Sequence, residues 1–296
     1  MTDAQAPMLG IIGGSGLYQI EGLNQTRWVE MASPFGKPSD AVLTGELDGL
    51  KVAFLPRHGR GHKLPPGEIN YRANIDVLKR LGVTDIVSVS AVGSLKENLK
   101  PGDFVLVDQF IDRTFARVKS FFGTGLVAHV SMAHPVCGRL GDMIAGAAKA
   151  LPEIALARGG TYVVMEGPQF STKAESELYR SWGASVIGMT NMPEAKLARE
   201  AELCYATIAM VTDFDCWHPD HDHVTVEAVI KVLLANAEKA RSLVKALAAA
   251  LPRHRLSCGQ GCDHALDYAL ITAPDARDPE MIKKLDAVAG RVLGRG

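Results

Sequence analysis

The sequence lacks the marks of several large classes of protein. Its 32 Lys and Arg residues against 33 Asp and Glu give a formal net charge of -1, so it offers no basic surface for nucleic acid or for an anionic membrane. No run of 18 apolar residues is present, so no transmembrane helix is predicted. The first five residues lack the basic and apolar regions of a signal peptide. We therefore expect a cytoplasmic protein with neither nucleic-acid nor membrane partners.

Two common nucleotide-binding motifs are also missing. Gly13-Gly14-Ser15-Gly16 follows an apolar run, but Gln19 stands where a dinucleotide fingerprint needs its third glycine. The chain has no Gly-x-x-x-x-Gly-Lys-Ser/Thr loop for a nucleoside triphosphate. A glycine-rich turn with exposed amides and the Ser15 hydroxyl is still suited to a small anion.

Cysteine is scarce, with five residues in the chain of 296. Cys258-Gly-Gln-Gly-Cys262 is the one close pair, and a disulfide bond and a metal site are the alternatives to free thiols there. A zinc site needs about four ligands, and His264 supplies only one more nearby. In a reducing cytoplasm we expect free thiols and no metal.

Apolar, β-branched runs alternate with helical patterns along the chain. Strands are predicted at residues 9–12, 52–55, 85–90, 104–107, 161–165, 185–188 and 204–211, and the clearest helices at 69–81 and 225–251. This alternation predicts an α/β fold with a central mixed, mostly parallel sheet flanked by helices. In such sheets ligands bind at the carboxyl ends of the strands.

The composition changes after Leu251. Residues 1–250 carry the strand and helix alternation of a single domain, whereas residues 251–296 begin with a loop and continue with two short helical patterns at 264–270 and 279–293. We predict that residues 251–296 form a C-terminal helical appendage of the same domain.

Two carboxylates, Asp213 and Asp215, follow the apolar run 204–211. If the strand continues through them, alternation directs both side chains to the same face. Two carboxyl groups in a partly buried site raise at least one pKa, which places a proton donor beside an acceptor. An adenine ring offers the matching N7 acceptor and N6 donor. The alternative is a turn with solvated carboxylates.

Other polar groups follow predicted strands and suit an oxyanion. A guanidinium group can bind an oxyanion through two parallel N–H groups, and an imidazole or a hydroxyl adds further hydrogen bonds. An exposed basic loop is the alternative for the segment that begins at Arg57. The residues concerned are Arg57, His58, Ser90, Ala91 and Thr190. Together they predict a site for a free oxyanion.

Apolar residues near these segments have two interpretations. Phe170 follows the strand 161–165 and can stack on a base or belong to the core. Val226, Val229 and Ile230 share one face of the helix 225–251, where they can line a pocket or pack in the core.

The order of several motifs resembles the trimeric purine nucleoside phosphorylase family. The resemblance runs from about residue 8 to about residue 245. The matching segments are Gly10-Ile11-Ile12-Gly13-Gly14-Ser15-Gly16-Leu17, Pro34-Phe35-Gly36-Lys37-Pro38-Ser39, Arg57-His58-Gly59, Asn70-Tyr71-Arg72-Ala73-Asn74, Ala91-Val92-Gly93-Ser94-Leu95, Pro101-Gly102-Asp103, Asp108-Gln109-Phe110-Ile111-Asp112, Glu166-Gly167-Pro168, Met189-Thr190, Pro193-Glu194-Ala195 and Asp213-Phe214-Asp215-Cys216-Trp217. This resemblance implies the single-domain phosphorylase/hydrolase-like fold and a homotrimer, with a hexamer of paired trimers as the alternative.

The resemblance also implies roles for individual residues. Phosphate is expected at Ser15, Arg57, His58, Ser90, Ala91 and Thr190. Asp213 and Asp215 are expected at the adenine, Phe170 beside the base and Met189 under the ribose. Val226, Val229 and Ile230 are expected around the 5′ end of the ribose, and His129 is expected to reach the site of a neighbouring subunit.

Within this family, the paired carboxylates and the apolar 5′ wall resemble the members that cleave 5′-methylthioadenosine. The expected reaction uses inorganic phosphate as co-substrate, needs no other cofactor, and gives adenine and 5-methylthioribose 1-phosphate. Three alternatives stay open. They are a phosphorylase of 6-oxopurine nucleosides or methylthioinosine, a nucleosidase that uses water, and a nucleoside-binding protein without catalysis.

Overall fold

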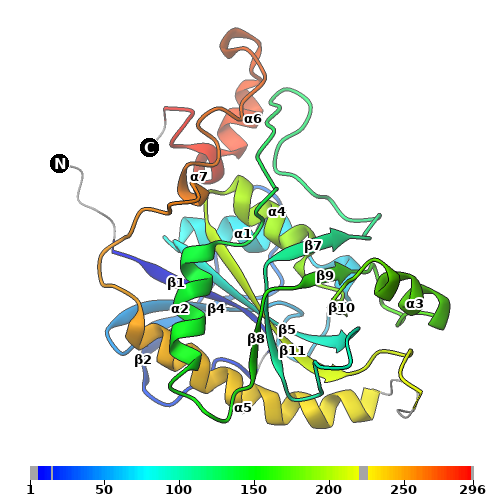
Figure 1. Ribbon diagram of the computed structural model, residues 1–296. Helices are drawn as coiled ribbons and strands as arrows, with labels where there is room; N and C mark the ends of the chain where they lie inside the picture. Colours follow the sequence, from blue (N-terminus) through cyan, green and yellow to red (C-terminus); the bar gives the residue numbers. More distant parts are fainter. Residues whose placement is uncertain (1–5, 15, 220–225, 295–296) are drawn as a thin grey trace.

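The structure is a computed structural model that describes residues 6–14, 16–219 and 226–294. A single mixed sheet forms its centre, and helices pack on both faces (Figure 1). The strands are β1 Met8–Gly13, β2 Leu23–Val29, β3 Val42–Leu47, β4 Leu50–Pro56, β5 Asp85–Ser94, β6 Phe104–Val107, β7 Gln109–Asp112, β8 Leu156–Arg158, β9 Thr161–Val164, β10 Val186–Gly188 and β11 Cys204–Asp213. The α/β fold predicted from the sequence is confirmed.

The sheet brings the carboxyl ends of several strands together at one end of the sheet. Its order is β2-β3-β4-β1-β5-β10-β9-β7, and β11 pairs with both β5 and β6. Strands β4, β1, β5 and β11 run parallel, so their carboxyl ends lie together. β10 runs antiparallel to β5, with Val186 opposite Ser94 and Ile187 opposite Gly93. The residues after β10 therefore run back along β5.

The helices are α1 Tyr71–Arg80, α2 Gly138–Ala148, α3 Lys173–Ser181, α4 Asn191–Glu200, α5 Val226–Ala250, α6 Pro279–Lys284 and α7 Asp286–Ala289. One core lies beneath α1, α4 and α7, and a second beneath α2 and α5. The side chain of Asn70 accepts the N–H of Ala73, so α1 begins two residues later than the predicted start at residue 69. None of the described helices is long and apolar enough to cross a membrane.

Residues beyond α5 rise along one side of the molecule to α7 and α6 (Figure 1). Leu266, Leu285 and Val288 contribute apolar side chains to the core beneath α1 and α4. Glu202 holds the segment by accepting the backbone N–H of Leu266 and pairing with Arg291 at 2.5 Å. The segment also reaches the connection between β7 and α2, where Ala128 pairs with Leu270.

Candidate active site

Asp213 and Asp215 lie at the carboxyl end of β11, but strand alternation is not what brings them together. A bulge between Val211 and Asp213 changes the register against β5, and the strand ends at Asp213. Asp215 adopts a φ of 52° in the following turn, and its N–H donates to Asp213 Oδ1 at 2.8 Å. The sequence argument from alternation was therefore wrong, because a bulge and a left-handed turn replace a regular strand.

Gly93 of β5 faces both carboxyl groups. A Cβ atom at this position would lie 2.9 Å from Asp213 Oδ1 and 3.3 Å from the Cβ of Asp215. Only glycine allows this approach without moving the turn. Trp217 fixes the other end of the turn by donating its indole N–H to the carbonyl of Ser94 at 2.7 Å.

Both carboxyl groups have raised pKa values. Burial raises the pKa of Asp213, against hydrogen bonds from Thr212 and from the N–H of Asp215. Burial also raises the pKa of Asp215, and the nearby charge of Asp213 raises it further. Oδ2 of Asp215 is buried and has no hydrogen-bond partner among the described residues. The pair thus combines a proton source with an open acceptor.

The Thr212 hydroxyl contacts the carboxyl group of Asp213. It lies 2.7 Å from Asp213 Oδ2 and 3.2 Å from the carbonyl oxygen of Val92. The carbonyl can only accept, and a hydroxyl has one hydrogen. The single hydroxyl hydrogen serves only one of these acceptors at a time, so Thr212 donates either to Asp213 or to the carbonyl of Val92.

Ser90 and Thr190 lie on neighbouring chain segments, because β10 leads back along β5. The Ser90 hydroxyl donates to Asn191 Oδ1 at 3.0 Å. The hydroxyl groups of Thr190 and Tyr162 are buried and close to each other, but neither makes a well-formed hydrogen bond in the described part of the chain. Ser90 and Ala91 lie within β5 and not at its end, since the strand continues to Ser94. These hydroxyl groups can bind an oxyanion.

Arg57 has a different environment from the one the sequence predicts. It is 2% exposed, and its Nε and Nη2 pair with the two carboxylate oxygens of Glu194 at 2.9 and 3.1 Å. Nη1 donates to the carbonyl of Val89 at 3.0 Å. The two parallel N–H groups of the guanidinium therefore bind Glu194, and not a free oxyanion. A single N–H on Nη1 is left for a phosphate oxygen.

His58 is a hydrogen-bond acceptor on its open side. Its Nδ1 lies 2.8 Å from the carbonyl oxygen of Leu64, so this nitrogen carries the hydrogen. Burial lowers the pKa of His58 to about 4, although the contact with Leu64 opposes the shift. A neutral ring with Nδ1 protonated offers Nε2 as an acceptor. His58 thus suits a phosphate oxygen that bears a proton.

Met189 and Phe170 lie on adjoining segments. The Met189 sulfur packs closely on Gly167, where an added Cβ would come within 2.6 Å of it. Phe170 is 46% exposed, so it is not a core residue and its ring is open to a partner. Arg117 joins the segments by donating to the carbonyl of Met189 at 2.6 Å and pairing with Glu166 at 2.7 Å.

Other predicted residues lie apart from these or cannot be placed. Ser15 and the side chains of Val226 and Val229 fall outside the described residues. Ile230 is 48% exposed on α5, which argues against core packing. His129 is exposed and lines a hollow with Lys119, Met132, Lys196 and Glu200, away from the carboxylates.

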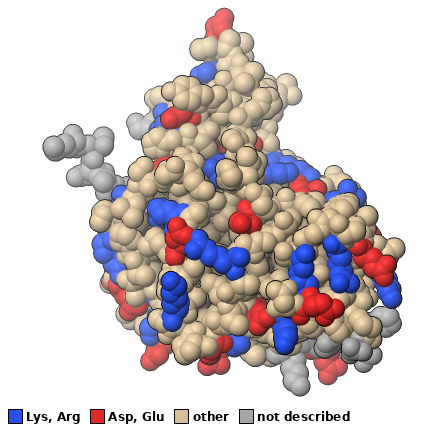
Figure 2. All heavy atoms as spheres, viewed as in Figure 1, with Lys and Arg blue, Asp and Glu red and all other residues tan. Residues whose placement is uncertain are grey.

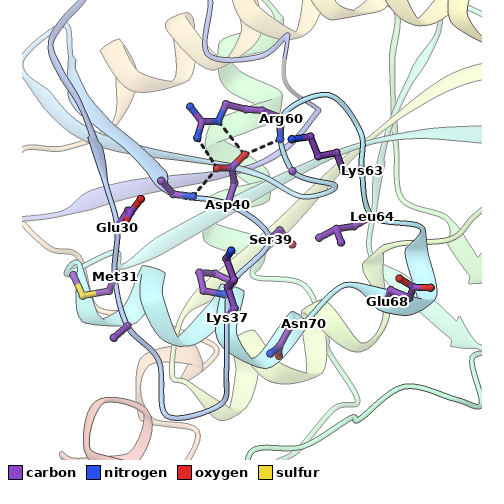
Figure 3. Close-up of a pocket in the computed structure, with 14 residues that line it drawn as sticks. Glu30, Met31, Lys37, Ser39, Asp40, Arg60, Lys63, Leu64, Glu68 and Asn70 are labelled. Carbon is purple, nitrogen blue, oxygen red and sulfur yellow. Dashed lines mark hydrogen bonds and ion pairs between the residues drawn. The ribbon is translucent and has the colours of Figure 1, made fainter.

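A hollow of about 1100 Å³ adjoins the loop that carries His58 (Figure 3). Arg60 crosses it and pairs with Asp40 at 2.8 Å, while Lys37 and Lys63 point toward the open space. The hollow contains neither Asp213 nor Thr190. We place the chemistry at the carboxylate pair, because unpartnered buried polar groups gather there.

Sequence reasoning missed the polar network beneath the site. Glu194 accepts from Arg57, from Ser88 at 2.7 Å and from Tyr205 at 2.9 Å. The Asn191 amide nitrogen, which has two hydrogens to donate, lies within hydrogen-bond distance of the hydroxyl groups of Ser88, Tyr205 and Thr207. The motif Pro193-Glu194-Ala195 was visible, but only the fold shows that Glu194 is the counter-charge of Arg57.

Comparison with known proteins identifies the family. The family model described as Phosphorylase superfamily matches residues 8–249. A protein of Rhodospirillum rubrum named S-methyl-5′-thioadenosine phosphorylase is 67% identical, with 99% of this chain and all of that protein covered. One of the same name from Cereibacter sphaeroides is 64% identical over 97% of this chain and 98% of its own.

Solved structures agree with these relatives. A methylthioadenosine phosphorylase from an antarctic soil metagenomic library has a TM-score of 0.90 at 50% identity, covering 96% of this chain and 99% of that one. The methylthioadenosine phosphorylase of Schistosoma mansoni in complex with adenine has a TM-score of 0.76 at 39% identity, covering 82% and 91%. The chain therefore belongs to the phosphorylase superfamily, in the family of the S-methyl-5′-thioadenosine phosphorylases.

Proposed function

We propose that the protein catalyses the phosphorolysis of 5′-methylthioadenosine to adenine and 5-methylthioribose 1-phosphate. The observation that carries the proposal is the pair of buried carboxyl groups, Asp213 and Asp215, both with raised pKa values, at the end of β11. The relatives and solved structures named above carry the same activity in their names.

Adenine is a poor leaving group unless its ring is neutralised as the glycosidic bond breaks. A protonated Asp213 donates to N7 of the base and removes the developing negative charge. Asp215 accepts a hydrogen bond from the N6 amino group through its unpartnered Oδ2. A 6-oxopurine has an acceptor in place of that amino group, which disfavours the alternative substrate class.

Phosphate attacks from the side of Thr190 and Ser90. Its oxygens accept from the Thr190 hydroxyl, the backbone at Ala91 and the remaining N–H of Arg57, while a protonated oxygen donates to His58. We infer that Ser15 adds a further donor and that Met189 and Phe170 hold the ribose and the base. The phosphate also offsets the positive charge that develops on the sugar ring. The reaction needs no further cofactor or metal.

We further propose a homotrimer that acts in the cytoplasm. The segment between β7 and α2 and the C-terminal segment expose large apolar side chains, with Phe115 at 83%, Tyr268 at 99% and Ile271 at 60%. Exposed apolar surface of this kind is typical of subunit contacts. His129 lies on the segment between β7 and α2, and in the proposed trimer it reaches the substrate site of a neighbouring subunit.

A substrate panel tests the proposed function. Methylthioadenosine, adenosine and inosine are incubated with the enzyme, each with and without phosphate, and released base is measured. We expect adenine from methylthioadenosine only when phosphate is present. Equal release without phosphate contradicts the proposal in favour of a nucleosidase. Faster turnover of inosine contradicts it in favour of a 6-oxopurine phosphorylase.

The variant Asp213→Asn tests the role of the carboxyl proton. We expect a loss in kcat of about 10²–10⁴, the usual range for one general acid. Asp142→Asn is the matched control, because Asp142 is an exposed carboxylate on α2. Full activity of Asp213→Asn would remove Asp213 from the mechanism.

A further inference from the structure

Four of the five cysteine side chains meet in the interior of the molecule. Their sulfur atoms all lie within 4.8 Å of one another, and all four residues are buried. The sulfurs of Cys137 and Cys258 are 3.6 Å apart. We call this group the four-cysteine cluster, and its members are Cys137, Cys204, Cys258 and Cys262.

The spacing suits one thiophilic metal ion. Zinc binds four thiolates tetrahedrally with Zn–S distances of about 2.3 Å, which places the sulfurs about 3.8 Å apart. The observed contact of 3.6 Å and the limit of 4.8 Å bracket this value. Side-chain adjustments of less than about 1 Å therefore complete the site.

The chain delivers the ligands from three separate places. Cys137 immediately precedes α2, Cys204 is the first residue of β11, and Cys258 and Cys262 come from the loop after α5. That loop closes through a hydrogen bond of 2.8 Å from the N–H of Gly261 to the carbonyl of Cys258, with Gly261 at a φ of 67°. From the sequence alone only the pair in the loop and His264 stand close enough to be ligands, which predicts no metal, whereas the fold brings Cys137 and Cys204 to the pair.

The surroundings suit a negatively charged metal centre. Four thiolates around a doubly charged ion carry a net negative charge, which needs donors or cations close by. The guanidinium of Arg139 pairs with Asp85 and neighbours the sulfur of Cys204. Its Nε is buried and has no hydrogen-bond partner in the described part of the chain. An N–H in this position can donate to a thiolate.

We propose that the four-cysteine cluster binds one zinc ion and fastens the C-terminal segment to the sheet. Each thiol gives up its proton when the ion binds, and no oxidant is involved. The role is structural, because Cys204 and Asp213 stand at opposite ends of β11. A strand of this length spans about 30 Å, too far for the ion to touch the reacting atoms.

Metal analysis of the full-length protein tests the proposal. The protein is purified under reducing conditions, reconstituted with Zn²⁺ and desalted, and its metal content is measured by mass spectrometry. We expect about one zinc per chain. X-ray absorption should show four sulfur neighbours at about 2.3 Å. Replacement with Co²⁺ should give the thiolate charge-transfer bands of a tetrahedral site, which histidine ligands do not produce.

Variants separate the cluster from the remaining thiol. Cys258→Ser should lose the zinc and lower Tm by roughly 5–15 °C, the scale of a lost structural contact network. If Cys258→Ser fails to fold, Cys262→His is the alternative variant. A histidine can still bind zinc, so this variant should retain the metal. Cys216→Ser is the matched control and should keep the full zinc content. A protein without zinc after reconstitution, with four free thiols or two disulfide bonds in their place, overturns the proposal.

Discussion

At the scale of single residues, the ion pair of Arg57 and Glu194 shows how the site is supported from below. Both side chains are almost fully buried, and they exchange two hydrogen bonds. Burial lowers the pKa of Arg57, but the charge of Glu194 outweighs it and raises that pKa. Removing one partner leaves an unpaired charge inside the protein.

We expect Arg57→Met to destabilise the protein by about 3–5 kcal/mol. The added substitution Glu194→Met should restore part of that loss, because it removes the unpaired carboxylate. Arg60→Met is the surface control, since the Arg60 side chain is 49% exposed and its pair with Asp40 should contribute much less. Urea unfolding of these variants and of Glu194→Met alone measures the differences. A strictly additive double variant would mean that the two residues do not act as a pair.

Glu200 makes stability depend on pH. Burial raises the pKa of Glu200 to about 7, although the N–H of Phe121 and the hydroxyl of Ser120 donate to it. In the unfolded chain Glu200 has its ordinary pKa of 4.5, so it releases its proton at a lower pH than in the folded protein. The stability that the protonated Glu200 contributes to the folded protein is therefore complete below pH 4.5 and is lost as the pH rises to about 7.

A rise in pKa of this size corresponds to a stability loss of about 3 kcal/mol across that pH range. We expect Glu200→Gln to lose correspondingly less stability than the wild type between pH 4.5 and 8. Glu177→Gln, on the exposed side of α3, should follow the wild type. Unfolding free energies measured at both pH values decide the matter, and parallel curves for wild type and Glu200→Gln would contradict it.

At the scale of elements, the close approach of β5 and the turn after β11 depends on Gly93. We expect Gly93→Ala to lower kcat and weaken adenine binding, because the new methyl group displaces Asp213 and Asp215. Gly141→Ala on α2 is the control, since its Cβ would meet Leu106 at an ordinary contact distance of 3.7 Å. Steady-state kinetics and adenine titration compare the two. Unchanged kinetics in Gly93→Ala would show that the turn can shift without consequence.

The strands that could be predicted from the sequence are those buried on both faces. β1 and β11 are nearly continuous apolar runs and lie where the sequence indicates, whereas β5 alternates apolar residues with buried serines and continues four residues past its predicted end. β2 was missed because it lies at the sheet edge and its side chains are mostly exposed, so no apolar pattern marks it. α4 was obscured by Pro193 and by the non-helical backbone at Met192.

The site residues divide in the same way. Short motifs at strand ends pointed to the carboxylate pair, to Thr190 and to His58. The partners that define their chemistry are far away in the sequence, as Glu194 is from Arg57 at a separation of 137 residues. Thr172 and Glu175 form a capping box at the start of α3, and this spacing could have located that helix from the sequence.

At the scale of the whole molecule, the proposed trimer makes a prediction about mixed assemblies. Charged side chains of both signs are interspersed over the main body, whereas the projecting upper part shows mostly other residues (Figure 2). If His129 serves a neighbouring subunit, then Asp213→Asn and His129→Ala damage different halves of one composite site.

Mixing subunits of the two variants should therefore restore activity. Random assortment leaves roughly one quarter of the sites with both wild-type residues. The subunits are denatured together, refolded and assayed, and each variant refolded alone is the control. Light scattering should give three times the chain mass of 31.7 kDa. A mixture no more active than the separate variants would show that His129 does not cross a subunit boundary.

The position of β11 has a consequence for how substrate enters. This strand pairs with β5 along its length and with β6 over residues 207–210, so its amide hydrogens should be among the last to exchange with deuterium. The catalytic carboxylates are therefore attached to one of the most rigid strands of the sheet. Glu166 is tied by its carboxylate to the N–H groups of Phe115 and Ala116 on an exposed segment. We expect deuterium uptake at residues 113–118 and 166–172 to be faster than in β11, and the passage of adenine in and out of the site to follow the breaking of the two hydrogen bonds from Phe115 and Ala116 to Glu166.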